Sequence, residues 1–282
     1  MKRIRLIPYW IEEKIFTIGK NCRIHSTAEI NVTEGFLGDS AILNAGVKIE
    51  GHRVEIGRES YFDKGAYIGG GSCFSTHAFL KAGDWLHMGT DSQINIAMGV
   101  TLGHSVGVGV NSKIFTHGAY IDSFNLGAPV QWDPVSIGNN VWLPNAWVNP
   151  GVVIGDNVVV AAMSLINKTI PSGSLAGGIP VKILKENYLP KTLSQIEELQ
   201  LVSLIESQCK ARTGFKKDIE FSYSTNVLGV LEEANLVSFN LKELVISGVV
   251  TQASIEVKDQ LRRNGIRFRY EPVDGVWGPW ET

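Results

Sequence analysis

One histidine stands in a setting that favours proton transfer. His117 is one of six histidines in the chain, lies in the segment FTHGAYIDSFNLGAPVQWDP (residues 115–134), and is followed by a glycine. An unperturbed imidazole titrates near about pH 6.5, so histidine is the natural general base at neutral pH. A loop histidine can instead hydrogen-bond its own turn, but we favour the catalytic interpretation. We expect Asp122 or a backbone carbonyl to orient its ring.

A six-residue period surrounds this histidine and extends over most of the chain. An aliphatic residue followed by a small or polar one recurs at this spacing, for example at Ile18-Gly19, Ile56-Gly57, Leu102-Gly103, Ile137-Gly138 and Ile154-Gly155. The period suits a short strand and a tight corner, with the aliphatic side chain inward and the next residue small enough to turn. Strands of an ordinary β-sandwich recur about every 8 to 12 residues. We therefore predict a triangular β-solenoid of roughly seven coils over residues 15–187.

The segment 115–134 interrupts this period, with good repeats on both sides. An insertion of this length must leave the coil, and long loops in compact folds tend to be functional. Its aromatic residues favour an ordered loop. His117 stands at the root of this excursion loop, where its side chain can face the coil of a neighbouring subunit.

After Pro190 the pattern changes to that of a small α+β domain, residues 190–282. The spacing of an amphipathic helix is seen at Leu193, Ile196, Leu199, Val202 and Ile205. The segments IEFSY, LVSFNL and ELVISG predict short strands, SIEVKDQLRRNG a second helix and IRFRYEPV a last strand. This domain holds no histidine, so we expect no catalytic set in it. Residues 1–14 are expected to cap the first coil, because an open solenoid end exposes strand edges.

Composition excludes several classes of function. The formal net charge of −2 argues against a nucleic-acid footprint, which needs a basic face. No stretch approaches the roughly 20 apolar residues of a membrane span. Glu12 and Glu13 cut short the apolar run that follows the basic N-terminus, so we interpret it as mature protein and not as a signal peptide. Three scattered cysteines fit a reducing cytoplasm better than a disulfide framework.

Three motifs carry a family resemblance that covers about residues 15 to 187. IGNNVW, NPGVVIGDNVVV and the closing AGGIPVKILKE resemble the hexapeptide-repeat acyltransferases, in particular the galactoside and xenobiotic-type O-acetyltransferases. The resemblance implies a left-handed parallel β-helix, acetyl-coenzyme A as donor, and a homotrimer with active sites between subunits. His117 also falls where this family places its catalytic histidine, about one loop before IGNNVW. The fold class we expect is therefore mainly β, a left-handed β-helix with a small C-terminal α+β domain.

The resemblance also implies where coenzyme A would lie. The family places the pantetheine arm along the last coils, where small residues let it approach the backbone, and it has basic residues near the phosphates. The matching positions here, with one outward-facing tryptophan, are Trp142, Ala161, Ala162, Ser164, Lys168, Gly178, Pro180 and Lys182. Met163 departs from the family, which has glycine in this turn.

Acyl transfer needs a base for the acceptor proton and donors for the oxyanion, and we expect a backbone N–H to serve as the donor. No serine or cysteine stands in a nucleophile motif, so we predict direct transfer without an acyl-enzyme. An aromatic and polar cleft of the kind that holds a sugar is predicted from Trp85, His87, Asp91, Tyr120 and Trp132. We therefore predict acetylation of a hydroxyl, or of an amine, on a sugar or sugar nucleotide for a surface polysaccharide. A xenobiotic or an amino acid is the alternative acceptor.

Other functions on the same fold remain open. His104, in LGHSVG, is a second candidate base, although a corner histidine is more often structural. Together with His77 and His117 it suggests the zinc site of a γ-class carbonic anhydrase, but a glycine stands where that family has its next histidine. We expect no metal. A non-catalytic solenoid scaffold is the third possibility.

Overall fold

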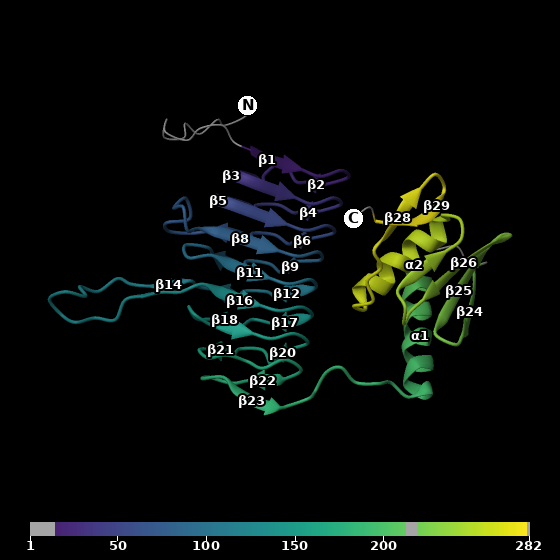
Figure 1. Ribbon diagram of the computed structural model, residues 1–282. Coiled ribbons are helices and arrows are strands. Elements are labelled where there is room, and N and C mark those ends of the chain that lie inside the picture. Colours follow the sequence, from purple (N-terminus) through teal and green to yellow (C-terminus); the bar gives the residue numbers. More distant parts are fainter. Residues whose placement is uncertain (1–14, 213–218, 281–282) are drawn as a thin grey trace. The chain divides into compact units, whose positions relative to one another are not determined.

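The computed structural model describes residues 15–212 and 219–280, and Figure 1 shows its elements along the chain. The chain divides into two compact units, residues 1–191 and residues 192–282. Each unit has its own hydrophobic core. The predicted cap over residues 1–14 lies outside the described residues.

Short strands make up the first unit. The larger sheet contains β1 (Ile15–Ile18), β3 (Glu29–Leu37), β5 (Lys48–Ile56), β7 (Tyr67–Gly69), β8 (Phe79–Ala82), β10 (Gln93–Asn95), β11 (Val100–Leu102), β13 (Lys113–Ile114), β16 (Val135–Ile137), β18 (Trp147–Val148), β19 (Val153–Ile154) and β21 (Leu165–Ile166). The second sheet contains β2 (Arg23–Ile24), β4 (Ile42–Leu43), β6 (Tyr61–Phe62), β9 (His87–Met88), β12 (Val106–Val108), β17 (Val141–Leu143), β20 (Val159–Val160), β22 (Leu175–Gly177) and β23 (Lys182–Lys185). The closing pair β22–β23 is antiparallel, whereas neighbouring coils pair in parallel.

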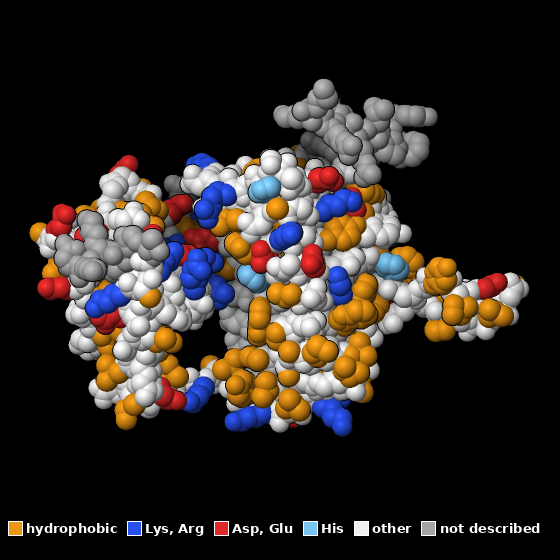
Figure 2. Space-filling model, turned by 180° about the vertical axis from the view of Figure 1, so that it is seen from behind, with side chains coloured by type: hydrophobic (Ala, Val, Ile, Leu, Met, Phe, Trp, Pro, Cys, Tyr) orange, Lys and Arg blue, Asp and Glu red, His pale blue; other side chains and the backbone are white. Residues whose placement is uncertain are grey.

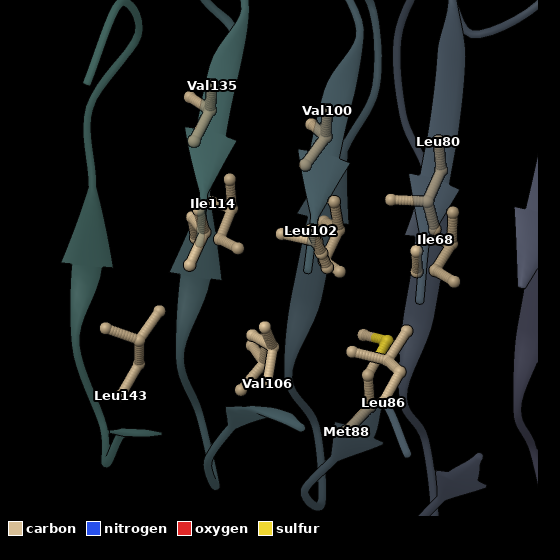
Figure 3. Close-up of a cluster of buried hydrophobic side chains, with 14 of the residues drawn as sticks. Ile68, Leu80, Leu86, Met88, Val100, Leu102, Val106, Ile114, Val135 and Leu143 are labelled. Atoms are coloured by element: carbon tan, nitrogen blue, oxygen red, sulfur yellow. The ribbon is translucent and has the colours of Figure 1, made fainter. Parts of the chain in front are cut away.

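The register stacks the aliphatic residue of one coil on that of the next. Ile49 pairs with Ile68, Ile68 with Ile94, and Ile94 with Ile114. These side chains are fully buried. Figure 3 shows part of this aliphatic column, with Ile68, Ile114 and Leu102 among the labelled residues. Burial of this column explains the six-residue period, because each six-residue side of a coil must place one aliphatic side chain in the interior. The predicted fold class is confirmed: a left-handed parallel β-helix and a small α+β domain.

One corner of the β-helix is closed by polar side chains that accept hydrogen bonds from the preceding coil. The backbone N–H of Arg58 donates to Asp84 Oδ1 (2.9 Å), that of Asp84 to His104 Nδ1 (2.9 Å) and that of His104 to Asn139 Oδ1 (2.8 Å). Asp156 accepts in the same way from Asn139. We call Asp84, His104, Asn139 and Asp156 the corner ladder. It satisfies backbone donors that the strand ladders leave unpaired at the turns.

A glycine precedes each member of this ladder, because the coils approach closely there. A Cβ atom on Gly103 would lie 2.7 Å from the backbone carbon of Gly138, which is shorter than any normal contact. The small residue predicted after each inward aliphatic is therefore required by the distance between the coils.

Between β13 and β16 the chain leaves the coil as a hairpin. Its strands β14 (His117–Gly118) and β15 (Gln131–Trp132) pair antiparallel, with His117 opposite Trp132. Figure 1 shows the hairpin extending away from the coils. Its loop exposes Tyr120 and Phe124 almost completely, at 102% and 94%. We call residues 117–132 the arm; it carries apolar side chains at its tip and His117 at its base.

Over its described residues, the second unit is a four-stranded antiparallel sheet with two helices and a hairpin. Its elements are α1 (Gln195–Lys210), β24 (Glu220–Ser224), β25 (Val227–Glu232), β26 (Asn235–Asn240), β27 (Val245–Ser247), α2 (Gln252–Arg263), β28 (Tyr270–Val273) and β29 (Val276–Pro279). The sheet order is β24-β25-β26-β27, and β28 pairs with β29. Strand β25 was not expected from the sequence, because Gly229 interrupts its apolar run and both of its faces carry buried residues.

Helix α1 buries only part of its predicted apolar stripe. Val202 and Ile205 lie in the core of the second unit, but Ile196 and Leu199 are 69% and 50% exposed. The helix starts with a capping box, in which the Ser194 side chain accepts from the Glu197 N–H and the Glu197 carboxylate accepts from the Ser194 N–H. The predicted helix is therefore present, and its first turn is stabilised by its cap and not by core contacts.

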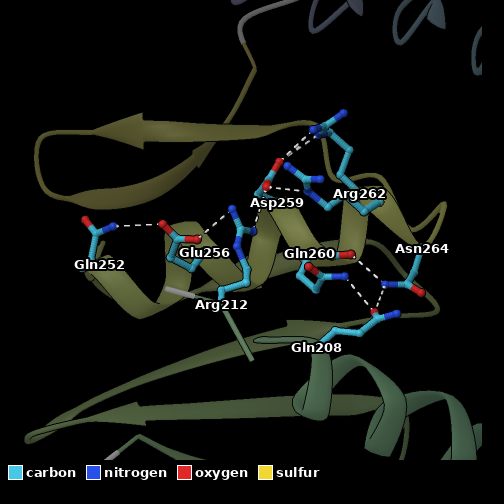
Figure 4. Close-up of polar contacts among 9 residues, drawn as sticks. Gln208, Arg212, Gln252, Glu256, Asp259, Gln260, Arg262 and Asn264 are labelled. Carbon is cyan, nitrogen blue, oxygen red and sulfur yellow. Dashed lines mark hydrogen bonds and ion pairs between the residues drawn. The ribbon is translucent and has the colours of Figure 1, made fainter. Parts of the chain in front are cut away.

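Charged side chains connect the end of α1 to α2 (Figure 4). Arg212 donates to Asp259 (2.9 Å) and pairs with Glu256 (3.1 Å). Asp259 also accepts from Arg262 (2.7 Å) and Arg263 (2.9 Å). Burial raises the pKa of the Asp259 carboxyl, but the hydrogen bonds from the three arginines outweigh it and hold the pKa well below its usual range.

Candidate active site

His117 is held at the base of the arm by contacts on two sides. Its imidazole stacks on the indole of Trp132, with ring centroids 4.8 Å apart and the planes 17° from parallel. Its Nδ1 atom lies 3.1 Å from Oδ1 of Asn95, at the end of β10. The histidine is half-buried, whereas Asn95 is only 3% exposed. The side chain is therefore placed by one polar and one aromatic neighbour.

The surroundings of Asn95 determine which ring nitrogen of His117 carries the proton. The backbone N–H of Ala97 donates to the Asn95 side chain at 3.2 Å, and a backbone N–H can only donate, so the atom that faces it is the amide oxygen. The same oxygen accepts from the Thr116 hydroxyl at 2.8 Å. His117 Nδ1 must then carry a proton to bond this oxygen. In the neutral ring, Nε2 therefore keeps its lone pair, as a general base requires.

Asp122 does not orient His117 within the chain. Its carboxylate accepts from the backbone N–H of Phe124 (2.9 Å) and of Asn125 (2.8 Å), inside its own turn of the arm. The hydrogen bond from the Asn125 side chain is the main reason that the pKa of Asp122 lies below its ordinary value. Asn95 takes the orienting position instead. The only sequence signal for this role of Asn95 was that a polar residue directly follows Ile94, whose strand pairs with that of Ile114.

His104 is a structural residue and not a second base. Its Nδ1 accepts from the backbone N–H of Asp84, so the remaining proton of a neutral ring lies on Nε2 and leaves no lone pair free. Within the described residues, no group of three histidine, cysteine or acidic side chains is placed to hold a metal ion.

The residues expected to bind the acceptor have different surroundings within the chain. Trp85 is only 7% exposed, at a corner, and its indole N–H donates to Glu59 at 2.9 Å. His87 stacks on Tyr61, with centroids 5.4 Å apart. Asp91 is an exposed corner residue. Tyr120 is exposed in the arm, and Trp132 stacks on His117. Burial of Trp85 leaves its indole no open face for a ligand.

The residues expected to bind coenzyme A lie on the last coils. Trp142 is 43% exposed, and a Cβ atom on Gly107 would lie 2.3 Å from its ring, so the indole lies across this glycine. The remaining surface positions, Ala162, Lys168, Gly178, Pro180 and Lys182, are exposed, and Ala161 is half-buried.

Ser164 has a structural role in the same coils. Its hydroxyl donates to the carbonyl oxygen of Ala161 at 2.6 Å and accepts from the backbone N–H of Gly178 at 3.0 Å. Because it is only 3% exposed, it ties two coils together and offers little surface to a ligand.

The turn at Met163 keeps the backbone that a glycine would have. Met163 has a φ of 61° and a side chain that is 67% exposed. The left-handed conformation costs a non-glycine residue about 1 kcal/mol. The substitution therefore changes the side chain presented at this corner and leaves the path of the turn in place.

Exposed apolar side chains gather over the last coils (Figure 2). The apolar side chains of the last coils that are at least half exposed are those of Trp147, Met163, Ile179 and Leu184. Contiguous apolar surface of this kind marks an interaction site. No helix in the described part of the chain is long and apolar enough to span a membrane.

Comparison with known proteins finds acetyltransferases. No family model matches the chain. It is 29% identical over 132 residues to the galactoside O-acetyltransferase of Escherichia coli K12, covering 43% of this chain and 64% of that protein. It is 28% identical over 120 residues to the putative lipopolysaccharide biosynthesis O-acetyl transferase WbbJ of the same organism, covering 38% and 57%. The chain thus spans less than two thirds of the length of either relative.

Among solved structures, the galactoside acetyltransferase in complex with coenzyme A aligns with a TM-score of 0.38 at 24% identity, covering 48% of this chain and 64% of that chain. The resemblance to O-acetyltransferases predicted from the three sequence motifs is confirmed by the named relatives, to which this chain is similar in sequence over the residues covered.

Proposed function

We propose that this chain is an acetyl-coenzyme A-dependent acyltransferase that moves an acetyl group directly onto a hydroxyl, or an amine, of a sugar or sugar nucleotide in surface polysaccharide biosynthesis. The observation that carries the proposal is the hydrogen bond between His117 Nδ1 and Asn95 Oδ1. Asn95 Oδ1 holds the proton on Nδ1 and leaves the Nε2 lone pair free, in a chain related to a galactoside O-acetyltransferase.

In the proposed reaction His117 moves one proton. Acetyl-coenzyme A supplies the thioester carbonyl. His117 Nε2 takes the proton of the acceptor hydroxyl while the hydroxyl oxygen forms a bond to the carbonyl carbon. As the carbon–sulfur bond breaks, the protonated Nε2 returns the proton to the departing sulfur. The other ring proton stays on Nδ1 throughout and keeps its hydrogen bond to Asn95 Oδ1, so the ring keeps one orientation in both half-steps.

The last coils suit a long, anionic donor. Exposed Lys168 and Lys182 are free to meet phosphates, and Trp142 offers an accessible indole. Ala161, Ala162, Gly178 and Pro180 would line the path of the pantetheine arm, and buried Ser164 would shape that path. His87, Asp91 and Tyr120 remain candidates for the acceptor, contributed by different subunits.

We further propose a homotrimer in the cytoplasm. The tip of the arm exposes Tyr120, Phe124 and Leu126 at 102%, 94% and 73%, and such side chains are normally covered by a partner. A second copy of the chain, with its exposed last coils, is a fitting partner. The three cysteines are free thiols, which accords with a reducing compartment. Light scattering after size exclusion gives the subunit number directly.

A thiol-release assay tests the function. Metal-free protein is mixed with acetyl-coenzyme A and a panel of sugars, nucleotide sugars, amino acids and xenobiotics. Acceptor-dependent release identifies the transferase and its acceptor class. The variant His117→Ala should lose about 10²-fold or more in turnover and still bind coenzyme A, whereas the exposed control His77→Ala should not change.

Three outcomes contradict parts of this proposal. Near-wild-type turnover of His117→Ala refutes the base. Coenzyme binding without release across the panel refutes the acceptor class. Absence of coenzyme binding favours the scaffold, or a zinc protein if added zinc produces carbonic anhydrase activity.

A further inference from the structure

Trp132 lies against the proposed base and not in an open acceptor cleft. The sequence suggested that its indole binds a sugar, but it covers one face of the His117 ring at a centroid distance of 4.8 Å. It is 39% exposed, so the indole has a solvent side as well as a histidine side.

The backbone that carries Trp132 is fixed at several points. It pairs with His117 across the hairpin, and the next residue, Asp133, donates its N–H to the carbonyl oxygen of Thr116 at 3.0 Å. On the other side, the Gln131 side chain donates to the carbonyl oxygen of Pro150 at 3.1 Å. The stacked pair of His117 and Trp132 is therefore held by the strand pairing and hydrogen bonds at the base of the arm and does not depend on the exposed tip.

One hydrogen bond cannot by itself hold an imidazole ring. The bond from Nδ1 to Asn95 restrains one edge of His117, but the ring can still rotate about that bond and carry Nε2 away from the acceptor. A parallel indole on one face removes this freedom and leaves the Nε2 edge and the other face open. Its π-face also attracts the positive charge that the ring carries between the two proton transfers.

We propose that Trp132 is a positioning residue for His117, which holds the imidazole plane so that Nε2 faces the acceptor. The inference rests on the proposed acetyl transfer, since it assigns the role of Trp132 in that site. It predicts that loss of the indole lowers the rate of the chemical step more than the binding of either substrate.

Two substitutions and a control test the role in the full-length chain. Trp132→Leu removes the aromatic face, Trp132→Phe retains one, and Trp280→Leu removes a tryptophan from the second unit. With the acceptor found in the thiol-release panel, we expect kcat of Trp132→Leu to fall by about tenfold, with KM for both substrates within about twofold. Trp132→Phe should recover most of this loss. Trp280→Leu should match the unaltered protein.

A spectroscopic measurement tests the stack without any substrate. The ring protons of His117, assigned by their loss in His117→Ala, should be shifted upfield by the indole in the unaltered protein and move downfield in Trp132→Leu. An unchanged His117 resonance, an unchanged kcat, or a raised acceptor KM with unchanged kcat would each overturn the positioning role. If His117→Ala itself keeps its activity, the proposed function fails and this inference fails with it. If His117→Ala is inactive and Trp132→Leu is not affected, only this inference fails.

Discussion

The Nδ1 atom of His117 lies 3.1 Å from the Oδ1 atom of Asn95, and this contact joins the base of the arm to the buried interior of the coil. Asn95 is only 3% exposed, and Thr116, which also bonds its amide oxygen, is fully buried. The amide therefore cannot turn without leaving buried donors unsatisfied, which costs about 1–3 kcal/mol. The orientation of the histidine is built into the packing of the β-helix before any substrate binds.

Replacing Asn95 should impair catalysis more than binding. In Asn95→Ala the Nδ1 proton loses its acceptor, so the ring is free to adopt the other tautomer or another rotamer. We expect kcat to fall by about 10²-fold, with the affinity for coenzyme A within about twofold. Steady-state kinetics with the acceptor from the assay above, and calorimetric titration with coenzyme A, measure the two quantities.

The control for this prediction is Asn235→Ala, at an exposed position of β26 in the second unit. It should leave kcat unchanged. Equal activities of the Asn95→Ala and Asn235→Ala variants would show that Asn95 does not orient the base.

The sequence was sufficient to predict the coils because their requirement is local and repeated. Each side of a coil must bury an aliphatic residue such as Ile94, and the corner after it must accommodate a closely spaced neighbouring coil, as at Gly103. These two demands impose a period that is visible without a structure. Helical spacing alone does not show which residues are buried, since Ile196 has the spacing of the apolar face of α1 but is 69% exposed.

The partners of the site residues were not predictable, because they depend on register between coils. Asn95 and His117 are 22 residues apart, and only the pairing of β10 with β13 shows that they meet. Trp85 was expected at a ligand because it is aromatic and lies near charged residues, but its corner position turns it onto Glu59. His104 was a candidate base because it is a histidine, but its Nδ1 lone pair accepts a hydrogen bond from the backbone N–H of Asp84 in the corner ladder.

The corner ladder should contribute measurably to stability. Asp156 Oδ1 accepts from both the backbone N–H and the side-chain amide of Asn139, so Asp156→Ala leaves a backbone donor unpaired at the corner. We expect a loss of about 1–3 kcal/mol, measured as a lower midpoint of thermal unfolding. Asp156→Asn keeps the accepting oxygen and should lose less than half as much. Equal midpoints for the two variants would contradict the role of the acceptor.

We predict that a substitution of Met163, which has a left-handed backbone conformation in the last coils, stabilises the protein. Met163 has a φ of 61°, which glycine adopts without the steric cost of a Cβ atom. Met163→Gly should raise the free energy of unfolding by up to about 1 kcal/mol, after the greater entropy of glycine in the unfolded chain is deducted. The neighbouring Ala162→Gly, at an exposed position without a positive φ, should lower it. Thermal unfolding compares the two, and a less stable Met163→Gly would contradict the prediction.

Acid should weaken the second unit through Asp259. Its pKa is held below the value of about 3.9 for an unfolded aspartate, because the hydrogen bonds from Arg262, Arg263 and Arg212 outweigh the opposite effect of burial. A group whose pKa is lowered by folding stabilises the fold fully above its unfolded pKa and loses that contribution as the pH falls below it. Asp259→Asn should therefore destabilise this unit at pH 7 by about 1–3 kcal/mol, and the difference from the unaltered protein should shrink below about pH 4.

Urea unfolding followed by circular dichroism at 222 nm measures this difference, because both helices in the described part of the chain belong to this unit. The control is Asp274→Asn, at an exposed turn position whose positive φ suits asparagine. It should leave the unfolding curve unchanged at both pH values. An Asp259→Asn curve that coincides with the unaltered protein at pH 7, or a gap of constant size down to pH 2, would show that the arginine cluster does not depend on this carboxylate. A gap that closes only below about pH 4 would assign the acid sensitivity of the second unit to Asp259, because Asp259→Asn retains the other carboxylate of the cluster, Glu256.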